Sequence, residues 1–237
     1  MKKNETISGE LKWNPENNLG QFIPSPNGAY FVTYNPALEY LANKYGTDKI
    51  GHGYIPHYET HLPSNPGKIL EIGCLNGASL RMWKEFFPDT EISVIDIFKD
   101  KNNISKEDIE KEGFAAYKGD QSDINFLYTI KDMFNVIIDD GSHNSHHQQI
   151  SFKHLFVNSL CSGGIYVVED LHCCKEKYYW GNHVKSFKDT ILSVFHEYLK
   201  TGKFENDFFN ETENRIFNEL VADLKIYDDK IAFIRRR

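Results

Sequence analysis

From residue 68 to residue 170 the sequence alternates short apolar runs with stretches of helical periodicity, and this alternation constrains the fold more than any other feature. The apolar runs lie at 69–72, 92–95, 114–118, 135–138 and 164–168. Strands that alternate with helices form a parallel sheet, and strands that are apolar throughout are buried on both faces. We therefore expect an α/β fold with helices on both faces of a parallel sheet.

The remaining segments complete this architecture. Helices are expected at 36–45, 78–87, 106–112, 123–133, 143–160 and 187–199. Residues 1–35 hold several turn-forming prolines, asparagines and glycines and are expected to be irregular. Residues 222–227 and 231–235 read as two strands joined by a tight turn, an antiparallel hairpin at the sheet edge. A parallel core closed by such a hairpin resembles the seven-stranded methyltransferase variant of the Rossmann-like fold.

The composition limits what the chain can bind. Its 237 residues suit one domain, and we expect an N-terminal extension or lid at 1–65 followed by the main domain at 66–237. The net charge of −7 argues against nucleic acid or an anionic membrane surface as a partner. No run approaches about 18 apolar residues and the polar start lacks a signal-peptide core, so we expect a cytoplasmic protein without a membrane span. Whether copies of the chain form a homo-oligomer stays open.

The first strand leads into a glycine-containing turn, Glu71-Ile-Gly73-Cys-Leu-Asn-Gly77. The dinucleotide fingerprint G-x-G-x-x-G would need glycine where this chain has Leu75, so the dehydrogenase interpretation loses its main support. Gly73 and Gly77 allow the backbone to pass close to a ligand at the head of a helix. Asp96 ends the next strand, where a carboxylate can accept hydrogen bonds from two ribose hydroxyls. We expect a bound nucleoside, with contacts from Glu71, Gly73, Asn76, Gly77, Asp96 and Ile97.

Polar residues also follow the third and fourth strands. Asp120 and Gln121 are placed to meet the adenine side of the nucleoside, whereas Asp123 is expected to cap the next helix. Asp139 precedes Asp140 by one residue, so its side chain should point to the other face of the strand. There Asp139 can cap a helix, hold a loop or contact the cofactor.

Three carboxylates end neighbouring strands, because Asp140 follows the fourth strand while Glu169 and Asp170 follow the fifth. Neighbouring strands lie about 4.8 Å apart, so these side chains can converge. Three acids share such a space only when some are protonated or a cation lies between them. Carboxylate oxygens suit Mg²⁺, which keeps positions open for water or substrate oxygens. We therefore expect Mg²⁺ or another divalent cation at Asp140, Glu169 and Asp170.

His143 lies three residues after Asp140, beyond a Gly-Ser turn. A histidine there can take a proton from a hydroxyl held on the metal, because coordination lowers the pKa of the hydroxyl. His146 and His147 have no third ligand nearby with spacing suited to zinc, so packing roles are expected for both. His172 follows Asp170 and is interpreted as a neighbour of the site without a role of its own.

These motifs together resemble class I S-adenosylmethionine-dependent O-methyltransferases. The strings Glu71-Ile-Gly73, Asp139-Asp-Gly-Ser-His143 and Val168-Glu-Asp-Leu-His172 are similar, more narrowly, to those of metal-dependent sugar O-methyltransferases of the mycinamicin, macrolide deoxysugar type. The segment Lys44-Tyr-Gly-Thr-Asp-Lys49 with His52-Gly-Tyr54 also looks like that group, and the resemblance spans roughly residues 40 to 185.

The resemblance implies that the main domain is a methyltransferase domain, with S-adenosylmethionine as the methyl donor and a sugar-containing acceptor. It implies His143 as the general base and the metal ligands Asp140, Glu169 and Asp170. It also implies that an N-terminal group forms a lid over cofactor or substrate: Thr47, Lys49, His52, Tyr54 and Tyr58. An aromatic cluster would offer flat faces to a sugar ring or close a loop over the core: Tyr178, Tyr179 and Trp180.

Three alternatives remain open at this point. A catechol-type O-methyltransferase would use the same chemistry on an aromatic diol. A relative of the cephalosporin hydroxylases would need two histidines and one carboxylate for non-haem iron, a set that the expected carboxylate site lacks. A non-catalytic binding protein would bind the donor without turning it over, and its properties would not change on replacing His143.

Overall fold

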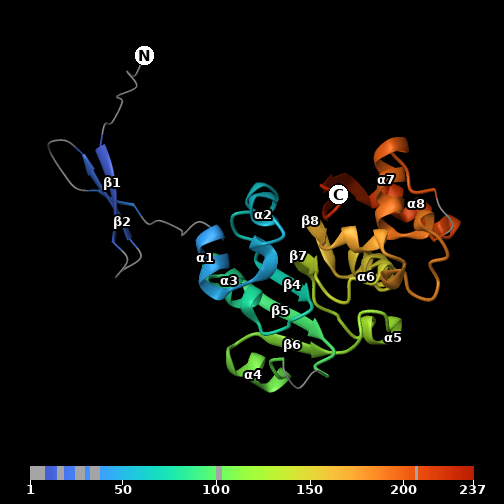
Figure 1. The fold of residues 1–237 in the computed structure, drawn as a ribbon, viewed down its shortest axis with the longest axis horizontal. Coiled ribbons are helices and arrows are strands. Elements are labelled where there is room, and N and C mark those ends of the chain that lie inside the picture. The colour runs from blue at the N-terminus through green and yellow to red at the C-terminus, as the bar shows by residue number, and fades with distance from the viewer. Residues whose placement is uncertain (1–8, 15–18, 25–29, 33–37, 100–102, 206–207) are drawn as a thin grey trace, which may run out of the picture.

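The computed structural model describes residues 9–14, 19–24, 30–32, 38–99, 103–205 and 208–237. Its centre is a seven-stranded sheet in the order β6-β5-β4-β7-β8-β10-β9 (Figure 1). The strands are β4 Lys68–Ile72, β5 Glu91–Asp96, β6 Ala115–Lys118, β7 Phe134–Asp139, β8 Leu160–Val168, β9 Val221–Tyr227 and β10 Ile231–Arg236. Strands β4 to β8 are parallel, and β10 pairs antiparallel with both β8 and β9. The predicted fold class, including the hairpin at the edge, is confirmed.

Helices cover both faces of this sheet (Figure 1). They are α1 Leu38–Tyr45, α2 Ile55–His61, α3 Ala78–Phe86, α4 Lys106–Lys111, α5 Ile124–Leu127, α6 Ser145–Asn158, α7 Ile191–Thr201 and α8 Glu211–Leu220. Short 3-10 helices are η1 Asp48–Ile50, η2 Leu171–Lys175, η3 Lys177–Tyr179 and η4 Phe187–Asp189. None of the helices in the described ranges is long and apolar enough to cross a membrane.

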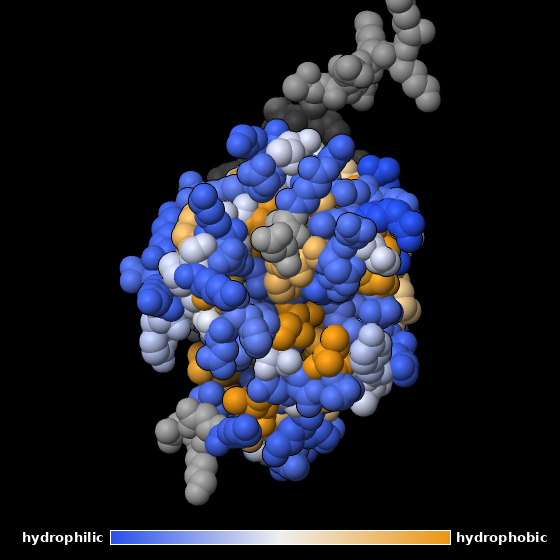
Figure 2. All heavy atoms as spheres, turned by 90° about the vertical axis from the view of Figure 1, so that its right-hand side faces the viewer, coloured by the Kyte–Doolittle hydropathy of each residue, from blue (hydrophilic) through white to orange (hydrophobic). Residues whose placement is uncertain are grey.

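Two apolar clusters form because successive side chains of a strand point to opposite faces. On β7, Val136 and Ile138 pack into the cluster with α1 to α4, whereas Ile137 packs into the cluster with α5 to α8. The surface on the side of α7 and α8 is largely hydrophilic, with apolar side chains exposed between polar ones (Figure 2). Segment 38–62, which precedes the sheet in sequence, therefore packs into the same core as the parallel strands.

Three expectations about regular structure were wrong. The helix expected at 123–133 ends at Leu127, after Asp123 caps its first turn through the backbone N–H groups of Asn125 and Phe126. The polar stretch before β9 contains α8, which starts with a capping box between Asn210 and Glu213. Residues 1–35 contain an antiparallel sheet rather than irregular chain: β1 Gly9–Asn14, β2 Leu19–Pro24 and β3 Tyr30–Val32. Turn-forming residues end two of these strands, and the Asn27-Gly28 pair lies outside the described residues.

Candidate active site

A cavity of about 470 Å³ opens at the carboxyl ends of the parallel strands. Several of the residues predicted to bind the cofactor line it: Thr47, Gly73, Asn76, Asp96, Ile97, Asp120 and Gln121. Asp140 and His143 line the same cavity from the loop after β7. This is the edge at which open α/β sheets bind ligands.

The turn after β4 is shaped by close backbone packing. Gly73 has φ +94°, and a Cβ atom there would lie 2.1 Å from the carbonyl oxygen of Asp140. Glycine is therefore required at this position for the loop after β7 to approach the turn. Gly77, at φ +77°, directly precedes α3 and does not line the cavity. The sequence predicted a cofactor contact for Gly77, but the structure places it at the start of a helix.

Asp96 is held firmly at the cavity wall. Its Oδ2 atom accepts a hydrogen bond of 2.9 Å from the backbone N–H of Cys74, and its Oδ1 atom accepts one of 2.6 Å from the N–H of Phe98. Both bonds come from backbone, so the position of the carboxylate is set by the turns after β4 and β5. Its partly exposed carboxylate retains acceptor capacity for a ligand in the cavity.

Asp139 is a structural residue rather than the cofactor contact that was one of its predicted roles. Its side chain is fully buried, and burial raises the pKa of its carboxyl group. It accepts hydrogen bonds from the Gln121 amide at 3.0 Å, from the Ser151 hydroxyl and from Tyr166. Gln121 in turn accepts a 2.8 Å bond from the N–H of Ser142. The loop that carries His143 is thus tied to a buried carboxylate.

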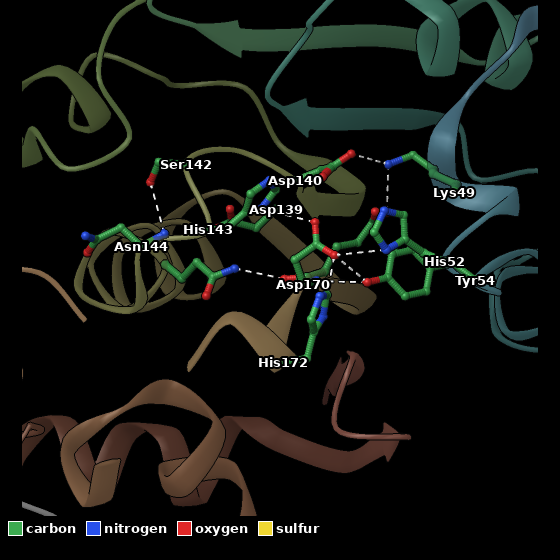
Figure 3. Close-up of polar contacts among 12 residues, drawn as sticks. Lys49, His52, Tyr54, Asp139, Asp140, Ser142, His143, Asn144, Asp170 and His172 are labelled. Atoms are coloured by element: carbon green, nitrogen blue, oxygen red, sulfur yellow. Dashed lines mark hydrogen bonds and ion pairs between the residues drawn. The ribbon is translucent and has the colours of Figure 1, made fainter. Parts of the chain in front are cut away.

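Lys49 lies among carboxylates rather than over the cavity as the lid prediction had it. Its side chain is fully buried, and its Nζ atom lies 2.5 Å from Asp140 Oδ2 (Figure 3). The same Nζ atom lies 2.8 Å from Glu169 Oε1. Glu71 Oε1 lies 3.1 Å away as an ion pair, while Glu71 Oε2 accepts a hydrogen bond from the indole of Trp83. The Tyr58 hydroxyl donates to Glu169 Oε1. We call Lys49, Tyr58, Glu71 and Glu169 the lysine cluster.

Burial and charge shift the pKa values of this cluster in consistent directions. Burial by itself lowers the pKa of Lys49, but the charges of Asp140, Glu169 and Glu71 raise it well above its usual value. Burial raises the pKa of Glu169, the charge of Asp140 raises it further, and Lys49 offsets only part of this. Glu71 also has a raised pKa, again because of burial. One ammonium group cannot neutralise three carboxylates, so the charge of Asp140 adds to burial in raising the pKa values of Glu71 and Glu169.

Asp170 has different surroundings. Its Oδ1 atom accepts a 2.6 Å hydrogen bond from Tyr54 and lies 3.6 Å and 3.7 Å from the Nδ1 atoms of His52 and His172 (Figure 3). Its Oδ2 atom lies 3.3 Å from His143 Nδ1. We call these five residues the histidine cluster. His143 and Asp170 both have left-handed backbone conformations, with φ of +54° and +55°.

Two groups of residues in the described chain have the geometry to hold a metal ion. One comprises Asp140, His143 and Asp170, and the other comprises His52, Asp170 and His172; within each group the ligand atoms lie within 4.8 Å of one another. Asp140 and Asp170 therefore converge as the sequence predicted, while Glu169 bonds to Lys49 and Tyr58. With three carboxylates at Lys49 and a fourth, Asp170, near Asp140, the donor set and the charge fit a divalent cation. The carboxylate set Asp140, Glu169 and Asp170 contains no histidine, as the sequence analysis stated, but the fold places a second set with two histidines, His52 and His172, beside Asp170.

The aromatic cluster is divided between framework and surface. Trp180 donates a 2.8 Å hydrogen bond to the carbonyl of Cys174 and accepts one from the N–H of His146. Tyr178 is 87% exposed and meets Tyr179 edge to face at 5.0 Å. Trp180 thus fixes the loop to α6, and Tyr178 is available to a ligand.

Two other histidines have contacts that account for their positions. His147 Nδ1 lies 2.9 Å from the Ser142 hydroxyl and lines the cavity, and the ring of His146 packs against His183 at 4.5 Å. Burial, reinforced by the neighbouring histidines, lowers the pKa of His146 to about 4.

Known proteins resemble this chain in sequence over somewhat more than half of its length, although no family model matches it. Mycinamicin VI 2''-O-methyltransferase of Micromonospora griseorubida is 38% identical over 151 residues, which is 57% of this chain and 36% of the relative. A tetracenomycin-C 3'-O-methyltransferase of Streptomyces olivaceus is 35% identical over 146 residues, 55% of this chain and 36% of that relative. The match thus spans just over a third of the length of these relatives.

Solved structures agree. The MycE methyltransferase of the mycinamycin pathway, in complex with Mg, SAH and mycinamycin VI, superposes with a TM-score of 0.69 at 28% identity, covering 85% of this chain and 54% of that one. The resemblance drawn from the motifs to sugar O-methyltransferases is therefore confirmed, and the shared fold extends well beyond the segment matched in sequence.

Proposed function

We propose that this chain is an S-adenosylmethionine-dependent O-methyltransferase that methylates a hydroxyl group of a sugar, in a glycan or a glycosylated natural product. We call the carboxylates Asp140, Glu169 and Asp170 the acidic site. One observation carries the proposal: the cavity at the ends of β4 and β5 is continuous with the acidic site, because Asp140 and the neighbouring His143 line it. A donor in the cavity and an acceptor at the acidic site would then be neighbours. The relatives named for sugar O-methylation support this choice of acceptor.

S-adenosylmethionine is proposed to occupy the cavity. Asp96, fixed by two backbone N–H groups, would accept hydrogen bonds from the ribose hydroxyls, and Asp120 would lie near the adenine. Gln121 would act mainly through the Ser142 loop, since its amide group is already bonded to Asp139 and Ser142. The presence of SAH in the MycE complexes supports this cofactor.

The metal site is proposed to involve Asp140, Glu169 and Asp170. When bound there, Mg²⁺ or another divalent cation would lower the pKa of an acceptor hydroxyl and orient it. His143 would accept the hydroxyl proton, while the acceptor oxygen forms its bond to the methyl carbon and the bond from carbon to sulfur breaks. Asp170, 3.3 Å from His143 Nδ1, would stabilise the imidazolium that results.

The remaining assignments follow from position. Tyr178, Tyr179 and Trp180 would border the acceptor, and segment 1–65 would form an extension before a methyltransferase domain at 66–237. A cytoplasmic location is proposed because the donor is a cytoplasmic metabolite.

The test is methyl transfer measured as SAH formation, with a panel of glycosides that carry vicinal hydroxyls and a matched panel of catechols. We expect turnover of a glycoside, and His143→Gln should lower kcat about 100- to 10,000-fold without changing SAH affinity. His196→Gln is the matched control, because His196 lies on α7 and pairs with Asp229. Turnover of catechols alone, or oxygen consumption without use of the donor, would overturn the sugar methyltransferase assignment.

A further inference from the structure

Two histidines and one carboxylate converge at the open side of the acidic site. Asp170 follows β8, His172 lies on η2, and His52 follows η1, more than a hundred residues earlier in the sequence. Both Nδ1 atoms face the same carboxylate oxygen, at 3.6 Å for His52 and 3.7 Å for His172. Figure 3 shows the two rings approaching Asp170 from different elements.

These separations do not suit hydrogen bonds. A nitrogen-to-oxygen hydrogen bond measures about 2.7–3.2 Å, so neither imidazole is bonded to the carboxylate. Two ligands that each lie about 2.1 Å from one metal ion are separated by roughly 3–3.5 Å, which is much closer to the observed spacing. His172 Nδ1 is buried and has no hydrogen-bond partner in the described part of the chain. Small movements of the rings would therefore complete a coordination shell.

The neighbouring contacts hold these three groups in place. The Tyr54 hydroxyl donates to Asp170 Oδ1 and accepts from the Asp170 backbone N–H at 3.2 Å. The His52 ring stacks on the Tyr54 ring at a centroid distance of 5.3 Å. The two histidine rings lie 6.1 Å apart at 37° to each other, so they converge without stacking. Their side chains are 37% and 38% exposed, which leaves the site accessible to an ion from solvent.

The position of Lys49 favours binding of a cation at Asp170 over binding at Asp140 and Glu169. Lys49 contacts Asp140 and Glu169 directly, so these two carboxylates already have a positive partner. Among the described residues, the positively charged groups at Asp170 are histidines alone, which are charged only when protonated. Imidazole nitrogen suits first-row transition metals, whereas Mg²⁺ favours oxygen ligands.

We infer that His52, Asp170 and His172 form a binding site for a divalent first-row transition metal ion, which this chain binds more tightly than Mg²⁺. The inference rests on the proposed function only in that both require a cation beside Asp170. It concerns the identity of the ion and its ligands, and it requires no methyl transfer.

The experiment uses Co²⁺ as a spectroscopic probe with the full chain, in the presence and absence of SAH. Ligation through Nδ1 leaves an exchangeable N–H at Nε2, so the Co²⁺ protein should show contact-shifted, solvent-exchangeable proton NMR signals from two imidazoles. His52→Gln and His172→Gln should each remove one signal. Each variant should also weaken Co²⁺ binding by about 10- to 100-fold or more. Loss of a residue that only hydrogen-bonds to a metal ligand already weakens metal binding by this factor. Calorimetric Mg²⁺ affinity should change less than about twofold, because Mg²⁺ does not depend on imidazole ligands.

His57→Gln is the control, since His57 lies on α2 and stacks on Tyr227 outside the ligand set. Circular dichroism and thermal melting establish that each variant is folded. Retention of both signals in the two variants, an unchanged Co²⁺ affinity, or tighter binding of Mg²⁺ than of Co²⁺ would overturn the inference. Its failure is separable from that of the proposed function: histidine signals without any methyl transfer would support the site, and Mg²⁺-dependent methyl transfer without histidine signals would contradict it.

Discussion

The lysine cluster and the histidine cluster meet at one sheet edge but solve the problem of buried charge differently. In the lysine cluster the cation is part of the chain: the Lys49 side chain is 0% exposed and that of Glu169 is 2% exposed. In the histidine cluster the imidazoles are more than a third exposed at His52 and His172, and Asp170 has no lysine or arginine partner in the described chain. The lysine cluster is therefore closed to solvent, whereas the histidine cluster is open enough to exchange a ligand.

Asp140 connects the two. It contacts Lys49 at 2.5 Å and also belongs with His143 and Asp170 to a group able to hold a metal. Removing residues from the lysine cluster should therefore mainly affect stability, and removing residues from the histidine cluster should mainly affect binding.

The largest effect is expected for Lys49→Met. Removing the ammonium leaves buried carboxylates without their charged partner, which costs about 3–5 kcal/mol in the free energy of unfolding. Denaturant titration measures this, and the double variant Lys49→Met, Glu169→Gln should recover part of the loss. Lys44→Met is the control, because Lys44 pairs with Glu85 at the surface and its loss should cost less than about 1 kcal/mol. Equal losses for the two lysines would show that the cluster is not closed.

Tyr58→Phe should have the next largest effect. The variant removes one of the two donors to Glu169 Oε1 and leaves the Lys49 ammonium as the other. A hydrogen bond to a charged group contributes about 1.5–3 kcal/mol to stability, and we expect a loss in this range. The free energy of unfolding from denaturant titration is again the measurement. A loss below the smaller of these values would mean that water replaces the hydroxyl.

Tyr54→Phe removes a tyrosine hydroxyl from the histidine cluster, just as Tyr58→Phe removes one from the lysine cluster. Its hydroxyl donates to Asp170, whose side chain is 11% exposed, so water can take over part of the interaction. We expect a smaller loss of about 0.5–1.5 kcal/mol by denaturant titration. A loss equal to or greater than that of Tyr58→Phe would contradict the contrast between the two clusters.

The smallest effect concerns pH. Burial raises the pKa of Glu71, so above its ordinary pKa of 4.5 the folded state binds more protons than the unfolded state. The stability from this group is therefore present below pH 4.5 and is lost as pH rises through the raised pKa. The unfolding free energy of Glu71→Gln minus that of the wild type should increase with pH.

Glu85→Gln provides the opposite sign. Burial would raise the pKa of Glu85, but hydrogen bonds from Lys44 and Tyr45 lower it. The stability from Glu85 is present above pH 4.5 and is lost as pH falls through the lowered pKa. For Glu85→Gln the unfolding free energy of the variant minus that of the wild type should therefore decrease with pH. If this difference changed with pH in the same direction for Glu71→Gln and Glu85→Gln, burial would not be the dominant influence on the pKa of Glu71.

Local pattern predicted most of the fold. The apolar runs, the turn at Gly73 and the closing hairpin could be read because strand periodicity and turn chemistry act over a few residues. The same reasoning missed α8, although the Asn210 and Glu213 capping box was present as a signal. It also missed the sheet of β1 to β3, because short strands between turns have too little pattern to distinguish them from irregular chain.

The succession of strands along the chain follows from the sequence alone, as does the placement of Asp140 and Asp170 at the ends of neighbouring parallel strands. The partners of these carboxylates are known only from the folded chain: Lys49, 91 residues before Asp140, lies buried between that carboxylate and Glu169, and His52 lies beside Asp170. The two kinds of information differ in how far apart in sequence the interacting residues are. Strand and turn preferences are settled by adjacent residues, whereas the partner of a buried charge is settled by which distant segment packs over it.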